Sequence, residues 1–165
     1  MKNKQRFPEL RFPEFSGDWV PSSLGDYYEF KNGVNADKGA YGRGTKFINV
    51  LDIISDQPIV YENIIGSVEI SLSEFQKNEV KYGDILFQRS SETREEVGQS
   101  NIYVDRDNSA TFGGFVIRGR PIKGNIPQFF HYLLKTDNVR KDMTSRSGGS
   151  TRYNIGQESL AQVSI

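Results

Sequence analysis

The sequence predicts an α+β domain, in which a curved, mostly antiparallel β-sheet carries helices packed toward the C-terminal part. Short runs rich in β-branched and aromatic residues, such as 47–54 and 84–88, alternate with turn residues along most of the chain. The clearest helical periodicity lies late in the chain, at 126–134. A length of 165 residues corresponds to a single domain over 1–165, and 16 glycines indicate many turns.

The first 21 residues are expected to form an extended arm. Three prolines fall within residues 1–21, which also contain Phe7, Phe12, Phe15 and Trp19. Proline fixes φ and opposes helix, so the pattern predicts an arm that aromatic side chains anchor to the domain.

Two strands and a glycine-rich loop follow the arm. Residues 24–31 form a predicted strand that ends at the turn pair Asn32-Gly33. Residues 33–46 are predicted to be a glycine-rich loop. Residues 47–54 (FINVLDII) are rich in β-branched residues and predict a central strand.

A short helix and a buried strand come next. Residues 71–78 predict a helix of one or two turns, because Ser71 and Glu74 stand at capping-box spacing. Residues 81–83 then predict a turn into a strand at 84–88. Two further strands are expected at 101–104 and 111–118.

The last third of the chain contains the predicted helices. An apolar stripe at helical spacing predicts a helix over 126–134, with Asn125 as its cap and Pro127 in its first turn. His131 and Lys135 fall off that stripe, so His131 is expected to be partly exposed. The members of the stripe are Ile126, Phe129, Phe130, Leu133 and Leu134.

A second helix and a tail complete the predicted elements. This helix is predicted over 138–144, with Asp137 as its cap. Gly148-Gly149 should end it before a strand-like tail.

Composition excludes several classes of site. The chain has no cysteine and one histidine, His131, so disulfides, thiolate zinc sites and histidine-rich metal sites are excluded. We expect no bound cofactor. The N-terminal residues contain no apolar run suited to a signal peptide or membrane span, which predicts a cytoplasmic protein without membrane contact.

Charge is balanced overall but uneven along the chain. The chain has 21 basic and 21 acidic residues. Residues 61–100 hold 4 basic and 8 acidic side chains, whereas 118–152 hold 8 basic and 2 acidic ones. The second segment could present a positive face, and the alternative is a solvated surface with accidental clustering.

Residues 39–46 (GAYGRGTK) nearly match a phosphate-binding loop, but the last two residues are in reversed order. The predicted next element is a strand, so no helix N-terminus would face a phosphate. A flexible loop that leaves Arg43 and Lys46 available is the better interpretation.

Catalytic motifs are weak or missing. Glu29 and Lys31, with Asp18 or Asp26, faintly resemble the carboxylate–lysine set of metal-dependent nucleases, which stays an alternative. The sequence has no glycine-rich methyltransferase loop with an Asn/Asp-Pro-Pro-aromatic step, and no nucleophile elbow around its serines. We therefore expect a non-catalytic domain.

Two polar loops are the main candidates for a binding site. Residues 88–94 (QRSSETR) follow a predicted strand, and residues 145–152 (SRSGGSTR) follow a predicted helix. Arg, Gln, Ser and Thr read base edges and grip phosphates, and glycine allows close backbone approach. The alternative is that both are ordinary solvated loops.

The order of segments resembles the specificity subunits of type I restriction–modification systems. The resemblance is carried by the opening LRFPEFSGDWVPSSLGDYYEFKNG and by GTKFINVLDI, KYGDILFQRS, FFHYLLKTDNVRKDMTSRSGGSTRYNI and LAQVSI. Together they cover nearly the whole chain in order. The segment LAQVSI is similar to a strand that, in members of the family, leads to a long helix.

The resemblance implies a target-recognition domain that reads one half of a bipartite DNA site. In such systems the partners are double-stranded DNA and the methyltransferase and restriction subunits. The sequence stops where the family's long helix begins, so we expect a fragment or a truncated half-subunit. By itself it should be a monomer that neither methylates nor cleaves DNA. The predicted DNA-binding residues are Arg43, Lys46, Gln88, Arg89, Ser90, Arg94, Arg140, Lys141, Arg146, Ser150, Thr151 and Arg152.

Within this set, Arg89 is expected to read a base, and Arg140 or Lys141 to position the phosphate backbone. A third interpretation is a protein- or carbohydrate-binding module that uses exposed aromatics such as Tyr41 and Tyr153.

Overall fold

The computed structural model describes residues 13–14, 16, 20–124 and 126–165. Most of the predicted arm, including its four aromatic anchors and Asp18, lies outside the described residues, as does Asn125. Within the described part, no helix is long and apolar enough to cross a membrane.

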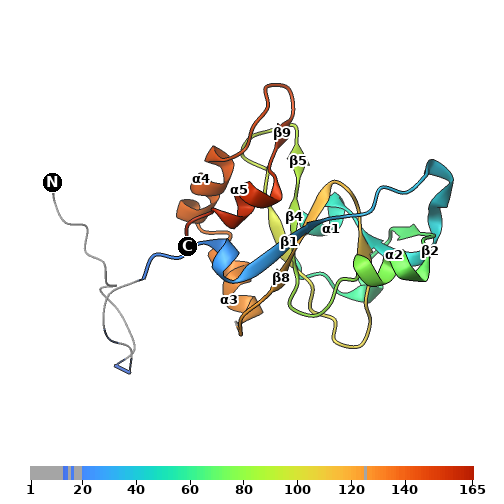
Figure 1. Cartoon of the computed structure of the whole chain (residues 1–165), viewed down its shortest axis with the longest axis horizontal. Helices are drawn as coiled ribbons and strands as arrows, with labels where there is room; N and C mark the ends of the chain where they lie inside the picture. The colour runs from blue at the N-terminus through green and yellow to red at the C-terminus, as the bar shows by residue number, and fades with distance from the viewer. Residues whose placement is uncertain (1–12, 15, 17–19, 125) are drawn as a thin grey trace.

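The main sheet has four strands, β1 (Tyr28–Asn32), β8 (Val116–Pro121), β4 (Ile85–Gln88) and β6 (Ser100–Ile102), in that spatial order (Figure 1). All neighbouring pairs are antiparallel. Every residue of β4 is buried, and its side chains alternate between two core clusters. The predicted α+β class and the strand at 84–88 are therefore confirmed.

Three helices from the C-terminal part contribute to the first core, and they are α3 (Pro127–Leu133), α4 (Asp137–Ser145) and α5 (Gln157–Ala161) (Figure 1). Ile85 and Phe87 of β4 lie in this core, and Tyr28 meets Phe130 of α3 edge-on at 5.1 Å between ring centroids. Its other buried members are Leu24, Val97, Ile117, Leu134, Val139, Met143, Ile155, Leu160 and Val163.

The second core lies under a three-stranded sheet of β3 (Ser67–Val68), β2 (Tyr41–Ile48) and β7 (Thr111–Phe112). β2 pairs antiparallel with β3 and parallel with β7. Two helices accompany this sheet, α1 (Val50–Ile53) and α2 (Leu72–Lys77). Ser71 caps α2 by accepting a hydrogen bond from the Glu74 amide at 3.2 Å, as its spacing predicted.

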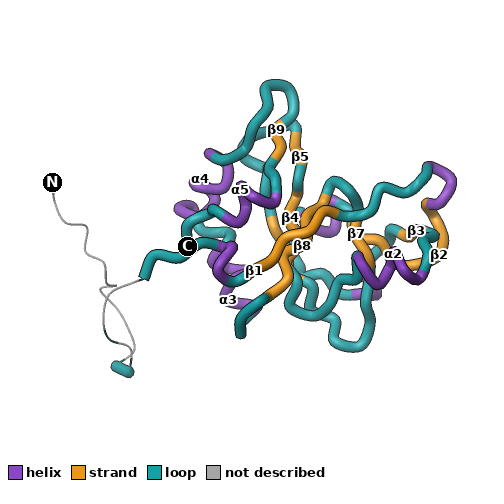
Figure 2. Tube along the Cα trace, in the orientation of Figure 1, coloured by secondary structure: helices purple, strands orange, loops and turns teal. Residues whose placement is uncertain are grey.

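Three 3-10 turns and a two-stranded ladder complete the described elements. The turns are η1 (Leu24–Asp26), η2 (Lys38–Ala40) and η3 (Tyr61–Asn63). The ladder consists of β5 (Ser90–Ser91) and β9 (Tyr153–Asn154), which project from the end of the main sheet (Figure 2).

The predictions for 33–46 and 47–54 were wrong. Residues 41–48 form β2, and Gly42 and Gly44 adopt φ of +94° and +87°, where the pairing with β3 shifts register. The chain becomes helical after Ile48 because Asn49 accepts from the Leu51 amide at 2.8 Å, and Asp52 accepts from the Asn49 amide at 2.8 Å. This capping box overrides the β propensity of the run.

The prediction of a turn at Asn32-Gly33 was also wrong. After β1 the chain runs on, and Val34 donates to the Phe112 carbonyl at 2.9 Å. A Cβ on Gly33 would lie 2.2 Å from the Gly113 carbonyl oxygen, so glycine serves close backbone approach at this position rather than a reversal of direction.

Other boundaries also differ from the predictions. The strand expected over 24–31 begins only at Tyr28, because Ser23 and Asp26 close a capping box on η1. The strand expected over 111–118 divides into β7 and β8 at a turn over 113–115.

Two details of the last helices were wrong. Thr136 is the N-cap residue of α4, one residue before the predicted Asp137. The strand-like tail predicted after Gly148-Gly149 is confirmed only at β9, because the chain then forms the helix α5 and ends with an isolated bridge between Ser164 and Ser23.

The helix predicted over 126–134 is confirmed as α3, but its stripe is only half buried. Phe130 and Leu134 face the core, whereas Ile126 and Phe129 are 68% and 55% exposed. His131, expected to be partly exposed, is 5% exposed, and its Nδ1 has no hydrogen-bond partner among the described residues. Apolar periodicity does not define how α3 is oriented against the rest of the fold. In the observed orientation, the His131 side chain is buried.

The stability of the protein is expected to fall between pH 7 and pH 5 because of His131. Burial, and next the charge of Lys135, lower the pKa of His131 below its usual value. The unfolded chain therefore takes up a proton near pH 6.5 before the folded protein does, which favours unfolding by at most about 1.4 kcal/mol per pH unit. Urea titrations at several pH values should show this slope in the wild type.

The free energy of unfolding of the variant His131→Gln should not change over the same pH range, because the chain contains one histidine. An unchanged slope in His131→Gln would contradict the assignment.

Candidate functional site

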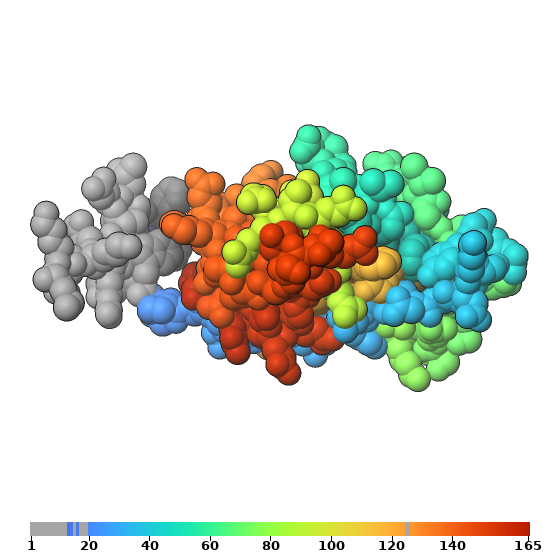
Figure 3. Space-filling model, turned by 90° about the horizontal axis from the view of Figure 1, so that it is seen from above, coloured from blue at the N-terminus to red at the C-terminus, as the bar shows by residue number. Residues whose placement is uncertain are grey.

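The fold brings the two polar loops that the sequence singled out into contact. Ser90 pairs with Asn154 and Ser91 with Tyr153 in the β5–β9 ladder, and the Ile155 amide donates to the Arg89 carbonyl at 3.0 Å. Figure 3 looks onto this face, with yellow-green residues of the first loop beside red residues of the second. We call this paired region, residues 88–96 and 145–154, the ladder tip.

Hydrogen bonds fix the shape of the ladder tip. Ser90 Oγ and Asn154 Oδ1 are 2.5 Å apart, and Gly148 and Asn154 exchange two backbone hydrogen bonds of 2.9 and 2.8 Å. Gly149 adopts a φ of +122°, and a Cβ there would lie 2.0 Å from the Arg152 carbonyl oxygen. The second loop thus requires glycine at this position.

The exposed surface of the ladder tip is polar and cationic at several points. Arg94 is exposed, and its Nε donates to the Thr144 carbonyl at 3.3 Å, which ties the first loop to the end of α4. The other exposed members of the predicted set here are Ser150, Thr151 and Arg152, and Lys141 is exposed on α4, outside the ladder tip. These side chains can reach a ligand without rearrangement of the core.

Arg89 and Gln88 lie at the base of the ladder tip. Arg89 is half-buried, and its Nη1 donates to the Gly114 carbonyl at 3.2 Å while its amide donates to the Phe115 carbonyl at 2.9 Å. Gln88 is 6% exposed, and its Nε2 donates to the Ser90 carbonyl at 3.1 Å. Gln88 therefore lies beneath the surface, whereas Arg89 lies at its edge.

Two further residues of the predicted DNA-binding set, Arg140 and Arg146, hold the loops in place. Arg140 Nη2 donates to the carbonyls of Glu95 and Val97 at 2.7 and 2.8 Å, and burial lowers the pKa of Arg140. Arg146 pairs with Asp142 at 3.0 Å, one helical turn earlier. In this arrangement both guanidinium groups hold backbone or side chains in place.

Arg43 and Lys46 lie on β2, in the other sheet, and are not part of the ladder tip. Arg43 pairs with Glu69 at 2.6 Å, and Lys46 Nζ donates to the Ile64 carbonyl at 2.5 Å. The expectation of a flexible loop that leaves both cations available was therefore wrong, because the segment is a paired strand.

The positive face expected from residues 118–152 does not form as predicted. Four of its eight basic residues are held by other groups, namely Arg118, Arg120, Arg140 and Arg146. The ladder tip also carries three exposed carboxylates, Glu92, Glu95 and Glu96. A hydrogen bond from Ser91 lowers the pKa of Glu96, so that charge persists at neutral pH. Its surface is therefore mixed in sign.

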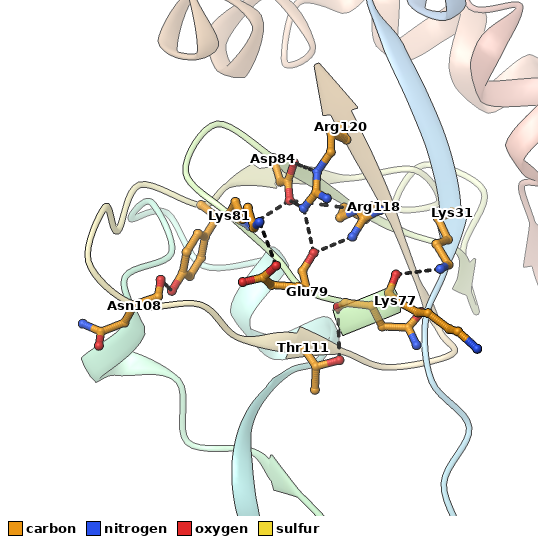
Figure 4. Close-up of polar contacts among 11 residues, drawn as sticks. Lys31, Lys77, Glu79, Lys81, Asp84, Asn108, Thr111, Arg118 and Arg120 are labelled. Atoms are coloured by element: carbon orange, nitrogen blue, oxygen red, sulfur yellow. Dashed lines mark hydrogen bonds and ion pairs between the residues drawn. The ribbon is translucent and has the colours of Figure 1, made fainter. Parts of the chain in front are cut away.

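The densest charged cluster was missed by the sequence reasoning and lies between β4 and β8 (Figure 4). Asp84 is 1% exposed, and both of its oxygens accept from Arg120, at 3.0 and 2.7 Å. Arg118 and Arg120 both donate to the Glu79 carbonyl. An acidic residue at the start of the predicted strand at 84–88 was the available signal. The cluster joins elements of the fold and leaves no open site.

The residues proposed for a metal-dependent nuclease do not converge. Asp26 accepts from Ser23, and Lys31 on β1 donates to the Lys77 carbonyl at 2.6 Å. Among the described residues, no group of three His, Cys, Asp or Glu side chains could hold a metal ion.

The aromatic residues named for a protein- or carbohydrate-binding module do not share a surface. Tyr41 is exposed on β2, whereas Tyr153 is half-buried against the first core.

Three solved structures match the described fold over 96% of this chain. One comes from work on complex assembly and conformational transition of the type I R-M system, with a TM-score of 0.62 and 17% identity. The others are the type I restriction–modification S subunit from M. genitalium (0.59, 14%) and the HsdS subunit from Thermoanaerobacter tengcongensis (0.58, 17%). This chain shares its fold with type I specificity subunits.

The resemblance predicted from the sequence is confirmed at the level of the fold. The chain spans 35%, 36% and 34% of the three matched chains, about a third of each. No protein-family model and no curated protein sequence matches it.

Proposed function

We propose that this chain is a DNA target-recognition domain of a type I specificity subunit, and that it reads one half of a bipartite site without catalysis of its own. The observation that carries the proposal is the ladder tip, where two polar loops from distant parts of the chain project together. The shared fold supports it. In the complete assembly, the domain would direct methyltransferase and restriction subunits to the site.

Within the proposed interface, exposed and half-buried residues have different roles. Arg94, Arg152 and Lys141 are exposed and would contact phosphates, which position a protein on the duplex. Ser150 and Thr151 would approach bases or phosphates over the glycines of the second loop. Arg89 at the base of the ladder tip would read a base edge.

DNA binding by the chain should be weak and should depend on salt. With about three phosphate contacts, the logarithm of affinity should fall with the logarithm of salt with a slope of about −2.7, or about 40-fold between 50 and 200 mM. Net neutrality and the three carboxylates of the ladder tip favour micromolar or weaker affinity. Fluorescence anisotropy with labelled duplexes selected by the chain from a random library measures both quantities.

A flat salt response, or no binding at low salt, would contradict the proposed interface. Hydrolysis of the duplex on addition of Mg²⁺ would instead favour the nuclease alternative.

Replacing Arg89 with alanine should weaken binding to the selected duplex by about 1–3 kcal/mol, or roughly 5–150-fold, and relax preference at one base pair. The matched control is Arg43→Ala, an exposed arginine on the second sheet, which should change affinity little. Thermal unfolding of both variants separates loss of the Gly114 contact from loss of DNA contact. Equal affinities for wild type and Arg89→Ala would remove Arg89 from the interface.

A further inference from the structure

A pocket of about 370 Å³ lies beside the base of the ladder tip. It is formed where β2, the start of α1 and the turn between β7 and β8 meet, and its lining includes Asn35, Tyr41, Phe47, Leu51, Gly114 and Phe115. The amber residues of that turn lie next to the loops of the ladder tip in Figure 3. A volume of this size is in the range of small-molecule sites.

Aromatic rings supply the walls of the pocket. Tyr41 and Phe47 meet edge-on with ring centroids 5.4 Å apart, and the Tyr41 hydroxyl accepts from the Ala36 amide at 3.2 Å. Phe115 is 61% exposed at the mouth of the pocket. Ring surface of this kind, open to solvent, is suited to stacking with a planar ligand.

Two successive glycines allow the walls to close in. A Cβ on Gly113 would lie 2.7 Å from the Phe47 ring, and one on Gly114 would lie 1.9 Å from Asn35 Oδ1. The Phe47 ring and the Asn35 amide therefore lie directly against the backbone of the turn. Any side chain at either position would displace the ring or the amide.

Asn35 provides the polar edge of the pocket. It is exposed, and no hydrogen bond to its amide group is present within the part of the chain that the structure describes. An amide side chain can donate and accept at once, and it pairs with the N6 and N7 edge of adenine. Aromatic walls with one free amide match a nucleobase better than a purely apolar ligand.

The pocket is continuous with the proposed DNA interface. The turn that forms its rim receives both hydrogen bonds from Arg89, at the Gly114 and Phe115 carbonyls. A strand of DNA that reaches Arg89 would therefore pass the mouth of the pocket.

We propose that this pocket binds one nucleobase of a DNA strand, unstacked from the duplex, with the Tyr41, Phe47 and Phe115 rings around it and the Asn35 amide at its polar edge. The inference rests on the proposed function for the source of the base. Enzymes that act on bases hold extruded bases in this way, between aromatic or apolar side chains with hydrogen bonds to the base edge. The cost of unstacking is least where the base is unpaired.

The test compares two duplexes of one sequence, one fully paired and one with a single unpaired adenine. Wild-type protein should bind the bulged duplex at least tenfold more tightly. Asn35→Ala and Phe115→Ala should lose this preference while they keep their affinity for the paired duplex. Both side chains are exposed, so neither change should disturb folding. Tyr132→Ala on α3, another exposed aromatic, should keep the preference.

A 5-iodouracil placed in the bulge gives an independent readout, since photocross-linking to Tyr41, Phe47 or Phe115 would map the base to the pocket. Equal affinity for both duplexes, with measurable binding to each, would overturn the pocket inference and leave the proposed function standing. No binding to either duplex would overturn both. Binding of free adenosine without preference for the bulge would overturn the DNA source of the base.

Discussion

Replacing Phe87 with alanine is expected to lower the free energy of unfolding by about 3–5 kcal/mol. Phe87 is fully buried on the central strand β4, and it meets the Phe30 ring of β1 at 5.8 Å between centroids. Gly119 on β8 leaves room for it, since a Cβ there would lie 3.1 Å from the Phe87 ring. The cavity left by the substitution would lie in the first core, where β4 packs against the helices.

The measurement is urea unfolding of the wild type and the variant, followed by circular dichroism. Phe115→Ala is the matched control, because Phe115 is 61% exposed and its removal should change stability by no more than about 0.5 kcal/mol. Similar losses in the two variants would mean that β4 is not the centre of the first core.

The second large effect is expected at the buried charge cluster. Asp84→Asn keeps the shape of the side chain but leaves Arg120 and the buried Arg118 without their counter-ion, at a cost of about 3 kcal/mol. The hydrogen bond to Asp84 raises the pKa of Arg120, whereas burial lowers the pKa of Arg118. The Lys81 amide also loses an ionised acceptor, at 2.8 Å. Figure 4 shows these contacts together.

An exposed ion pair provides the comparison. Glu69→Gln breaks the pair with Arg43, in which the two side chains are 66% and 59% exposed, and should change stability by less than about 1 kcal/mol. Chemical unfolding of both variants at low and high salt distinguishes the sites, because salt should alter only the exposed pair. Loss of stability in Glu69→Gln equal to that in Asp84→Asn would contradict the assignment of the buried cluster.

Elements that depend on interactions between near neighbours in the sequence were predicted correctly. Ser71 caps α2, the run at 84–88 is a buried strand, and the periodic segment at 126–134 is a helix. In each of these cases, the deciding interactions or the apolar periodicity lie within a few residues. The error at 47–54 also has a local cause, because the prediction rested on β propensity alone and did not consider the capping box of Asn49 and Asp52.

The composition of the candidate site was partly visible in the sequence, and its arrangement was not. The two loops were identified by their residue types, but their contact depends on the pairing of Ser90 with Asn154, 64 residues apart. The pocket near Arg89 combines segments around residues 35, 41, 50 and 114, none of which predicts a pocket by itself.

The sequence by itself determined the α+β class, the local helices, the strand at 84–88 and the residue types of the two polar loops. Only the tertiary structure decided that Arg140 and Arg146 support loops, that Arg118 and Arg120 are held by Asp84 and Glu79, and that His131 turns inward. The reason is physical. Backbone propensity and capping act over about one helical turn, whereas burial and ion pairing depend on which distant segments meet.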